Sequence, residues 1–186
     1  MKQKLIQLIA QKSFNYSDTP KFKLASGQMS QYYVNCKPTI LDPYGMNLVG
    51  NLVFEKLHHQ SVTAVGGLTF GADPIAVATS FVSGLKNQPV KAFSVRKVQK
   101  DHGMIRWIEG DIQEGDRLAI LEDVVTTGGS TVKAIHRVRS EGFRVVQVIV
   151  LVDRQEGGLD YIKTFVDRVD AIVTRKELMT HIEFLS

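Results

Sequence analysis

A polar loop in the second half of the chain has the residue types of a phosphate-binding site. The apolar run 118–125 contains two adjacent carboxylates and is followed by the sequence T-T-G-G-S-T at 126–131. Glycines let a backbone approach an anion closely, and hydroxyls and free N–H groups at a helix start donate hydrogen bonds to it. No lysine follows Gly129, so the spacing of a nucleoside-triphosphate loop is absent. We therefore expect one phosphate group to bind between Thr126 and Ser130.

The two carboxylates, Glu122 and Asp123, need a different partner, because they would repel a phosphate placed on them. A ribose diol, or a Mg²⁺ ion that bridges hydroxyls and phosphate, suits them chemically. One anion site beside one diol site fits a ribose 5-phosphate. The alternative is an ordinary strand-to-helix turn with capping or surface acids. Two carboxylates, four hydroxyls and a long apolar strand in register favour the binding site.

A basic stretch at residues 95–103 supplies the opposite charge. It holds three cations and a histidine, namely Arg96, Lys97, Lys100 and His102. The flanking segments 93–97 and 104–108 read as strands, which predicts an antiparallel hairpin projecting from the body. Such a stretch, taken alone, is more often a solvated hairpin tip. Beside a ribose-phosphate site, it could close over a diphosphate leaving group, neutralise its charge and exclude water.

Positioning these groups requires a sheet whose strands end at one edge. Apolar runs rich in β-branched residues recur at 62–65, 90–95, 118–125, 145–152 and 171–173. Segments with helical periodicity lie between several of them, at 44–58, 74–85 and 131–141, and another helix is expected near the N-terminus. Continuous apolar strands that alternate with helices indicate an α/β fold with a mostly parallel central sheet flanked by helices. Ligands bind such sheets beyond the carboxyl ends of the strands, where the polar loop would lie.

Composition narrows the class of protein further. The 186 residues fit one compact domain, 1–186, and the single cysteine, Cys36, cannot form an internal disulfide, which fits a reducing, cytoplasmic compartment. No apolar stretch approaches the roughly 18 residues needed to cross a bilayer, so we expect no membrane association. The excess of 23 Lys+Arg over 19 Asp+Glu is mild and spread along the chain. An anionic small substrate explains it as well as nucleic acid does, and we expect no nucleic-acid partner.

These motifs resemble a known family. Four apolar residues, two acids, two apolar residues and T-T-G-G-S-T at 118–131 resemble the phosphoribosyl diphosphate (PRPP) signature of type I phosphoribosyltransferases. The order R-K-x-x-K-D-H-G at 96–103 resembles the catalytic loop of the orotate phosphoribosyltransferases in particular. The resemblance implies the type I phosphoribosyltransferase fold, with a small hood from residues 14–40 and the C-terminal segment, and a basic hairpin lid at 96–106. It also implies a homodimer in which each lid reaches into the neighbouring subunit's site.

The resemblance assigns roles residue by residue. It implies that Lys100, Glu122 and Asp123 are catalytic, with Lys100 and His102 contacting the diphosphate. The implied PRPP-binding residues are Arg96, Lys97, Lys100, His102, Glu122, Asp123, Val124, Val125, Thr126, Thr127, Gly128, Gly129 and Ser130.

Three further stretches bear on the acceptor base. The aromatic-rich segment 22–35 looks like the family's hood over the base, and the glycine-rich segment 66–74 precedes a predicted helix and could present backbone N–H groups to pyrophosphate. Arg154 ends a predicted strand in D-R-x-E-G and could supply the planar cation that pairs with a carboxylate. The alternative is a surface arginine paired with Asp153 or Glu156. The resemblance assigns Arg154 and Thr126 to orotate.

Two positions depart from the family pattern. Many members have a lysine where this chain has Ala25, and many have Tyr-Lys where it has Phe70 and Gly71. Both changes remove a cation near the diphosphate or the base, so no lysine is assigned at either position.

The implied reaction is Mg²⁺-dependent, reversible transfer of the 5-phosphoribosyl group from PRPP to orotate, which gives orotidine 5′-monophosphate and pyrophosphate in pyrimidine (UMP) synthesis. Mg²⁺ would arrive with PRPP and water, and we predict no direct side-chain ligand. Two alternatives stay open: a phosphoribosyltransferase for another base, such as a purine, and a PRPP-sensing regulatory protein. The hood and Arg154 favour orotate, and the chain has no room for an added DNA-binding module.

Other residues have plainer expectations. The histidines His58, His59, His136 and His181 lack metal-ligand spacing, which indicates surface or helix-packing roles. Cys36 is expected to be a small packed or hood residue, and Trp107 is expected to pack at the base of the hairpin.

Overall fold

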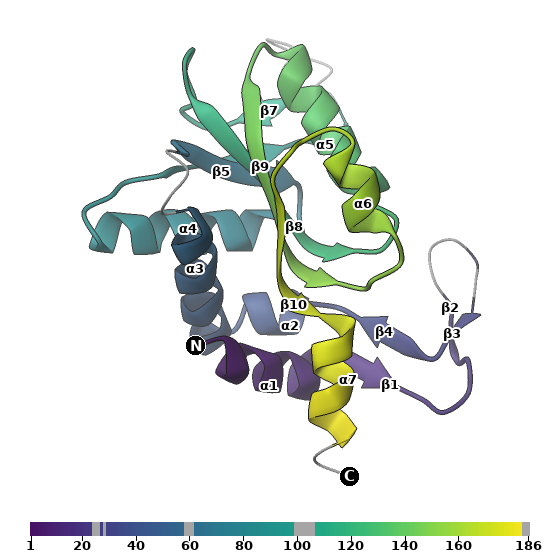
Figure 1. Cartoon of the computed structure of the whole chain (residues 1–186). Coiled ribbons are helices and arrows are strands. Elements are labelled where there is room, and N and C mark those ends of the chain that lie inside the picture. The colour runs from purple at the N-terminus through teal and green to yellow at the C-terminus, as the bar shows by residue number, and fades with distance from the viewer. Residues whose placement is uncertain (24–26, 28, 58–61, 99–106, 184–186) are drawn as a thin grey trace.

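The computed structural model describes residues 1–23, 27, 29–57, 62–98 and 107–183, and its centre is a six-stranded sheet (Figure 1). In the spatial order β10-β9-β8-β5-β6-β7, the strands are Val169–Thr174, Arg144–Asp153, Arg117–Val125, Ala64–Leu68, Lys91–Val95 and Ile108–Glu109. Neighbouring strands are parallel except β7, which pairs antiparallel with β6. The predicted α/β fold with a mostly parallel central sheet is confirmed.

Helices cover both faces of the sheet, as Figure 1 shows. One face packs against α5 (Gly129–Ser140) and α6 (Gly158–Lys163), and the other against α3 (Pro43–Leu57) and α4 (Asp73–Leu85). Alternate residues of β8 enter the two apolar clusters: Leu118 and Ile120 face α5, whereas Ala119 and Leu121 face the opposite side. Burial on both faces is why this strand reads as a continuous apolar run.

The strand predicted at 62–65 lies further along the chain, at Ala64–Leu68. Gly66 and Gly67 continue the strand, because the neighbouring strands approach too closely for a side chain. A Cβ on Gly66 would lie 2.1 Å from the carbonyl oxygen of Phe93, and one on Gly67 would lie 2.1 Å from that of Leu121. These glycines therefore mark close packing within the sheet rather than the end of the strand.

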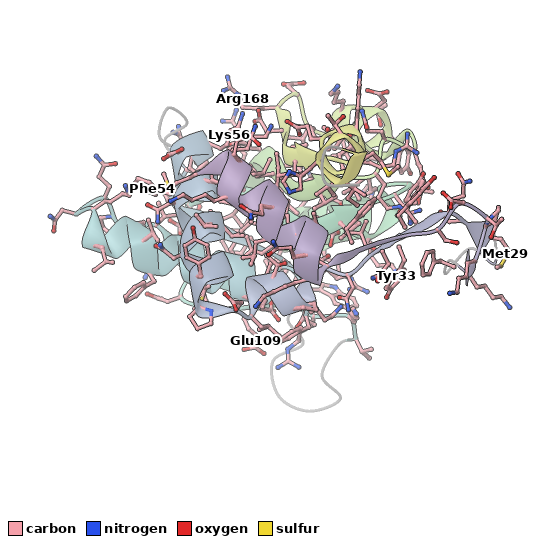
Figure 2. All side chains as sticks on the ribbon, turned by 90° about the horizontal axis from the view of Figure 1, so that it is seen from below. Met29, Tyr33, Phe54, Lys56, Glu109 and Arg168 are labelled. Atoms are coloured by element: carbon pink, nitrogen blue, oxygen red, sulfur yellow. The ribbon has the colours of Figure 1, made fainter. Side chains whose placement is uncertain are left out.

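The described residues of segment 14–40, the predicted hood, extend from one end of the molecule (Figure 1). In it β1 (Phe14–Tyr16) pairs antiparallel with β4 (Tyr32–Val34), and β2 (Phe22–Lys23) pairs antiparallel with β3 (Met29–Ser30). Figure 2 shows Met29 at the outer end of this extension and Tyr33 closer to the body. Three further helices lie at this end: α1 (Lys2–Lys12), α2 (Lys37–Ile40) and α7 (Arg175–Glu183), of which α7 packs against α1.

The structure contains the base of the predicted hairpin. Val95 of β6 pairs with Ile108 of β7, and the amide of Arg96 donates a 2.8 Å hydrogen bond to the carbonyl of Trp107. The predicted second strand, 104–108, overlaps the described residues only at 107–108, and β7 continues it to Glu109. Trp107 packs against the α5 side of the core, in agreement with its expected place at the hairpin base.

Candidate active site

The loop after β8 and the loop after β9 lie side by side at the carboxyl edge of the sheet. Val125, the last residue of β8, pairs with Asp153, the last residue of β9. The amide of Arg154 then donates a 3.0 Å hydrogen bond to the carbonyl of Val125. Thr126 and Arg154, which are distant in sequence, therefore follow the ends of two adjacent strands.

The polar loop opens directly into α5. Gly128 caps the helix with φ +83°, a left-handed conformation that favours glycine, and its carbonyl accepts the first helical hydrogen bond from Val132 at 3.0 Å. A Cβ on Gly128 would lie 2.8 Å from the carbonyl oxygen of Gly158, and a Cβ on Gly158 would lie 2.5 Å from that of Thr126. Two glycines are thus needed for the loop to pack against α6. Thr127, Gly129 and Ser130 remain exposed at the helix N-terminus, where free N–H groups favour an anion.

The acidic pair differs in its surroundings. Glu122 is 7% exposed, and its Oε2 accepts a 2.9 Å hydrogen bond from the hydroxyl of Thr131. Burial, and then the charge of Asp123, raises the pKa of Glu122 to about 8, against the opposing effect of the Thr131 hydrogen bond. Asp123 is only partly buried, and its Oδ1 accepts a 2.9 Å hydrogen bond from the amide of Val124. The more accessible carboxylate is therefore Asp123.

Two other segments lie close to Asp123. The thiol of Cys36 lies 3.7 Å from its carbonyl oxygen, and this cysteine is fully buried. Burial and the charge of Asp123 raise the pKa of the Cys36 thiol, which Lys37 only partly offsets, so the thiol stays protonated and packs as a small side chain. On the other side, a Cβ on Gly71 would lie 2.6 Å from Asp123 Oδ1.

The base of the β6–β7 hairpin is attached to α5 through Arg137. Its guanidinium carbon lies 4.0 Å from the ring centroid of Trp107, and it donates hydrogen bonds to the carbonyls of Arg96 and, at 3.0 Å, Lys97. The side chain of Arg96 pairs with Glu109 through a 2.7 Å Nε–Oε1 hydrogen bond, whereas Lys97 is exposed. Lys100 and His102 lie outside the described residues, as does Ala25.

Arg154 is almost fully buried, with 5% exposure. Its Nη2 lies 2.8 Å from Glu156 Oε1, and its guanidinium carbon lies 5.0 Å from the ring centroid of Tyr32 in the hood. Within the described part of the chain, its Nε and Nη2 make no hydrogen bond. Pairing with Glu156 was the plainer alternative for this residue, and the structure contains that pair without satisfying the arginine's hydrogen-bonding capacity.

Tyr32 and Arg175 are neighbours of Arg154 that sequence reasoning did not single out. Arg175 donates a hydrogen bond to the Tyr32 hydroxyl, and its guanidinium carbon lies 4.9 Å from the same ring. The aromatic-rich segment 22–35 was a signal for Tyr32. Arg175 had only a weak signal, its place directly after an apolar strand.

The described residues contain neither a metal-binding cluster nor a membrane-spanning helix. Among the described ranges, no three His, Cys, Asp or Glu side chains gather as a metal-binding group. His136 is exposed, with its ring edge-on to Phe165 at 5.3 Å, and His181 is partly buried on α7, while His58 and His59 are outside the described residues. In the same ranges, no helix has the length and apolar character to span a membrane.

Comparison with known proteins agrees with this geometry. No family model matches the chain. Orotate phosphoribosyltransferase of Aquifex aeolicus is 48% identical over 162 residues, which cover 87% of this chain and 88% of that protein. The crystal structure of Mycobacterium tuberculosis orotate phosphoribosyltransferase with Fe(III) dicitrate superposes with a TM-score of 0.83 at 35% identity, covering 95% of this chain and 98% of that one. The same enzyme with PRPP gives a TM-score of 0.76 at 30% identity, covering 95% and 90%. On its fold, its site geometry and these relatives, the chain belongs to the orotate phosphoribosyltransferase family.

Proposed function

We propose that this chain transfers the 5-phosphoribosyl group of PRPP to orotate, forming orotidine 5′-monophosphate and releasing pyrophosphate, a step of pyrimidine synthesis in the cytoplasm. One observation carries the proposal: the acidic pair, the polar loop and a buried arginine lie at the ends of the adjacent strands β8 and β9. A sugar phosphate with an anionic acceptor base needs these three kinds of group within one site.

The polar loop would hold the 5-phosphate. Residues 126–130 combine exposed hydroxyls with the free N–H groups of the α5 N-terminus, which carries the positive end of the helix dipole. The contact residues assigned to PRPP on this side are Glu122, Asp123, Val124, Val125, Thr126, Thr127, Gly128, Gly129 and Ser130. Glu122 and Asp123 would accept hydrogen bonds from the ribose hydroxyls.

The lid would hold the diphosphate. Arg96 and Lys97 directly follow β6, whose carboxyl end lies at the same edge of the sheet as that of β5. Arg137 ties these two residues to α5 through their carbonyls, so the polar loop and the base of the lid are joined by one helix. We assign Arg96, Lys97, Lys100 and His102 to the leaving group, where fixed positive charge is most effective as negative charge develops.

Arg154 and Thr126 would hold orotate. The Nε and Nη2 groups of Arg154 form the planar edge that binds a carboxylate through two parallel hydrogen bonds. Nε makes no hydrogen bond to a described residue, and Nη2 has only the ion pair with Glu156. Thr126 lies beside Arg154 because the Arg154 amide binds the carbonyl of Val125. A base that carries a carboxylate therefore fits this site better than an uncharged purine.

In the reaction, the bond between C1 of the ribose and the diphosphate oxygen breaks, and the electron pair leaves with pyrophosphate. A ring nitrogen of orotate forms the new bond to C1 and gives up its proton to water. Displacement at a sugar C1 passes through an oxocarbenium-like state. The acidic pair would hold the ring through its hydroxyls, and the lid cations would stabilise the departing anion. Because the ring nitrogen gives up this proton to water as positive charge develops on it, the proposal needs no strong general base.

Mg²⁺ would enter with PRPP. Two adjacent carboxylates, one of them partly buried, are compatible with this ion, which usually keeps several waters and binds through one or two carboxylates plus substrate phosphates. Asp123 would hold its waters, and we assign no direct side-chain ligand. When bound, the ion would neutralise part of the diphosphate charge.

We also propose a homodimer with shared lids, on the evidence of an apolar stripe. Val77, Phe81 and Leu85 on α4 are 57, 67 and 69% exposed and follow one another at helical spacing. Phe70, in the loop before α4, is also exposed, at 47%, and adjoins Gly71 beside Asp123. Exposed apolar patches of this kind mark protein interfaces, and a second copy on this one would lie next to the acidic pair.

The activity is tested by mixing the protein with PRPP, Mg²⁺ and orotate and following the loss of orotate absorbance. Orotate should be consumed and purine bases should not. Consumption of a purine instead would favour the transferase for another base, and a nucleic-acid gel shift without turnover would favour the PRPP-sensing regulator.

The role of Lys100 and the sharing of lids are tested by substitution. Lys100→Ala should lower kcat by roughly 100-fold or more without loss of folding, because it removes charge stabilisation made in the transition state. A kcat within about threefold of wild type would refute that role. Mixing Lys100→Ala with Asp123→Asn should restore part of the activity if lids are shared, and no recovery would contradict sharing.

A further inference from the structure

The C-terminal helix places a second guanidinium beside Arg154. Arg175 is the first residue of α7 and directly follows Thr174, which pairs with Asp153 of β9. The amide and hydroxyl of Thr174 donate hydrogen bonds to Glu177 Oε2 at 2.8 and 3.0 Å, and the Glu177 amide lies 3.3 Å from Thr174 Oγ1. This reciprocal cap fixes the start of the helix. Arg175 is therefore held next to the strand end from which Arg154 emerges.

Tyr32 links the two arginines. Its ring centroid lies 5.0 Å from the guanidinium carbon of Arg154 and 4.9 Å from that of Arg175. Its hydroxyl accepts a hydrogen bond from Arg175 and donates one to Glu156 Oε1 at 3.2 Å. The same Glu156 oxygen lies 2.8 Å from Arg154 Nη2. A continuous series of contacts therefore runs from Arg175 through Tyr32 and Glu156 to Arg154.

The Arg154 end of this series has donors to spare. Its Nε is buried and makes no hydrogen bond to the described residues, and its buried Nη2 has only the ion pair with Glu156, at 2.8 Å. A buried donor without an acceptor is costly. A carboxylate placed on that edge would satisfy both donors, provided that the guanidinium plane keeps its orientation. The groups that fix the plane are the Tyr32 ring and the Glu156 carboxylate, and Arg175 holds the hydroxyl between them. Two guanidinium groups and one carboxylate also leave this cluster with net positive charge.

We propose that Arg175 is a positioning residue for the carboxylate of the acceptor base. It fixes Tyr32 and Glu156, and through them it sets the edge of Arg154 that receives the carboxylate. The inference rests on the proposed function, since it takes orotate as the base. Arg175 itself need not touch the substrate.

The test compares Arg175→Met with Lys176→Met. Both substitutions remove one positive charge from the first turn of α7, but Lys176 is exposed and its side chain has no part in the cluster. Arg175→Met should raise the KM for orotate by about tenfold and leave the KM for PRPP within about twofold of wild type. Lys176→Met should change neither. Equal effects of the two substitutions, or an equal rise in both KM values for Arg175→Met, would overturn the proposal.

Two further variants separate positioning from a purely structural role. Arg175→Lys keeps the charge but loses the planar group, so it should raise the KM for orotate by about threefold. This variant also tests the proposal if Arg175→Met does not fold. In a Tyr32→Phe background, Arg175→Met should add less than about twofold, because the hydroxyl that connects the two is gone. A lowered melting temperature with an unchanged KM for orotate would overturn the inference. A wild-type protein that does not consume orotate would instead refute the proposed function.

Discussion

Replacing Glu122 with glutamine should make the ligand-free protein more stable at neutral and alkaline pH. Burial, followed by the charge of Asp123, raises the pKa of Glu122 from 4.5 to about 8. The folded protein therefore keeps this proton over a pH range in which the unfolded chain releases it. Glutamine has nearly the same shape, can still accept the hydrogen bond from Thr131, and cannot ionise.

The sign and size of the effect follow from proton linkage. Between the unfolded pKa of 4.5 and the folded pKa of about 8, the folded state binds more protons than the unfolded state, so the free energy of unfolding falls as the pH rises. Each pKa unit corresponds to about 1.4 kcal/mol, which gives an upper bound of about 5 kcal/mol across this range for Glu122. In a protein of this size, each kcal/mol shifts Tm by about 2–4 °C.

The assay is thermal unfolding without PRPP from about pH 5 to about pH 9, across the range in which linkage acts. Wild type should lose stability with rising pH, whereas Glu122→Gln should show a flatter profile and a higher Tm at the alkaline end. Glu55→Gln, which removes an exposed carboxyl group on α3, should follow wild type. Parallel profiles for wild type and Glu122→Gln would refute the reasoning that the buried acid destabilises the empty site.

Three other substitutions test the loop, the lid base and the C-terminal helix. Gly128→Ala should lower stability by about 2 kcal/mol or more and weaken PRPP binding measured by calorimetry, because alanine is strained at φ +83° and its Cβ would lie 2.8 Å from the Gly158 carbonyl oxygen. Arg137→Met should shift the fluorescence emission of Trp107, the only tryptophan of the chain, because it removes a guanidinium group 4.0 Å from the ring. It should also lower kcat, because it removes the hydrogen bond to the carbonyl of Lys97. Unchanged emission would contradict the contact with Trp107. Glu177→Gln should cost about 1 kcal/mol of unfolding free energy at neutral pH, measured by urea denaturation. The pKa of Glu177 is lowered because hydrogen bonds from Lys2 and Thr174 outweigh the opposing effect of burial, so this loss should vanish in acid as the wild-type carboxyl group protonates.

The sequence was most informative where function depends on a local pattern. The polar loop needs only consecutive residues. Its Gly128 is required for a reason that the sequence did not indicate, a left-handed backbone and close packing against α6, and the approach of the loop to an anion stays a prediction. The strands could be predicted from the sequence because burial on both faces leaves an uninterrupted apolar run, as in β8. The end of β5 lies beyond its predicted place because Gly66 and Gly67 suggest a loop by composition, whereas the sheet requires them for close packing.

Contacts between distant segments could not be read in the same way. Arg175 and Tyr32 are 143 residues apart, and they meet because α7 starts at the end of β10 while the hood folds back over the strand ends. The partner of Arg96 depended on the register of the hairpin, which sets Ser94 opposite Glu109 and so brings that carboxylate within reach of the arginine. In its present pairing, Arg96 would have to exchange Glu109 for a phosphate oxygen in order to act on the substrate.

At Gly71, the loss of one family lysine is coupled to the position of Asp123. A side chain there would begin 2.6 Å from Asp123 Oδ1, so a lysine would require this carboxylate or the loop before α4 to move. The space that a lysine would occupy is instead filled by the acid assigned to the ribose. Since a lysine at this position requires such a movement, the positive charge for the diphosphate is expected to come from elsewhere. The lid has three cations and a histidine within one short segment, Arg96, Lys97, Lys100 and His102. A chain built in this way should depend on its lid more heavily than one that keeps a lysine near the diphosphate.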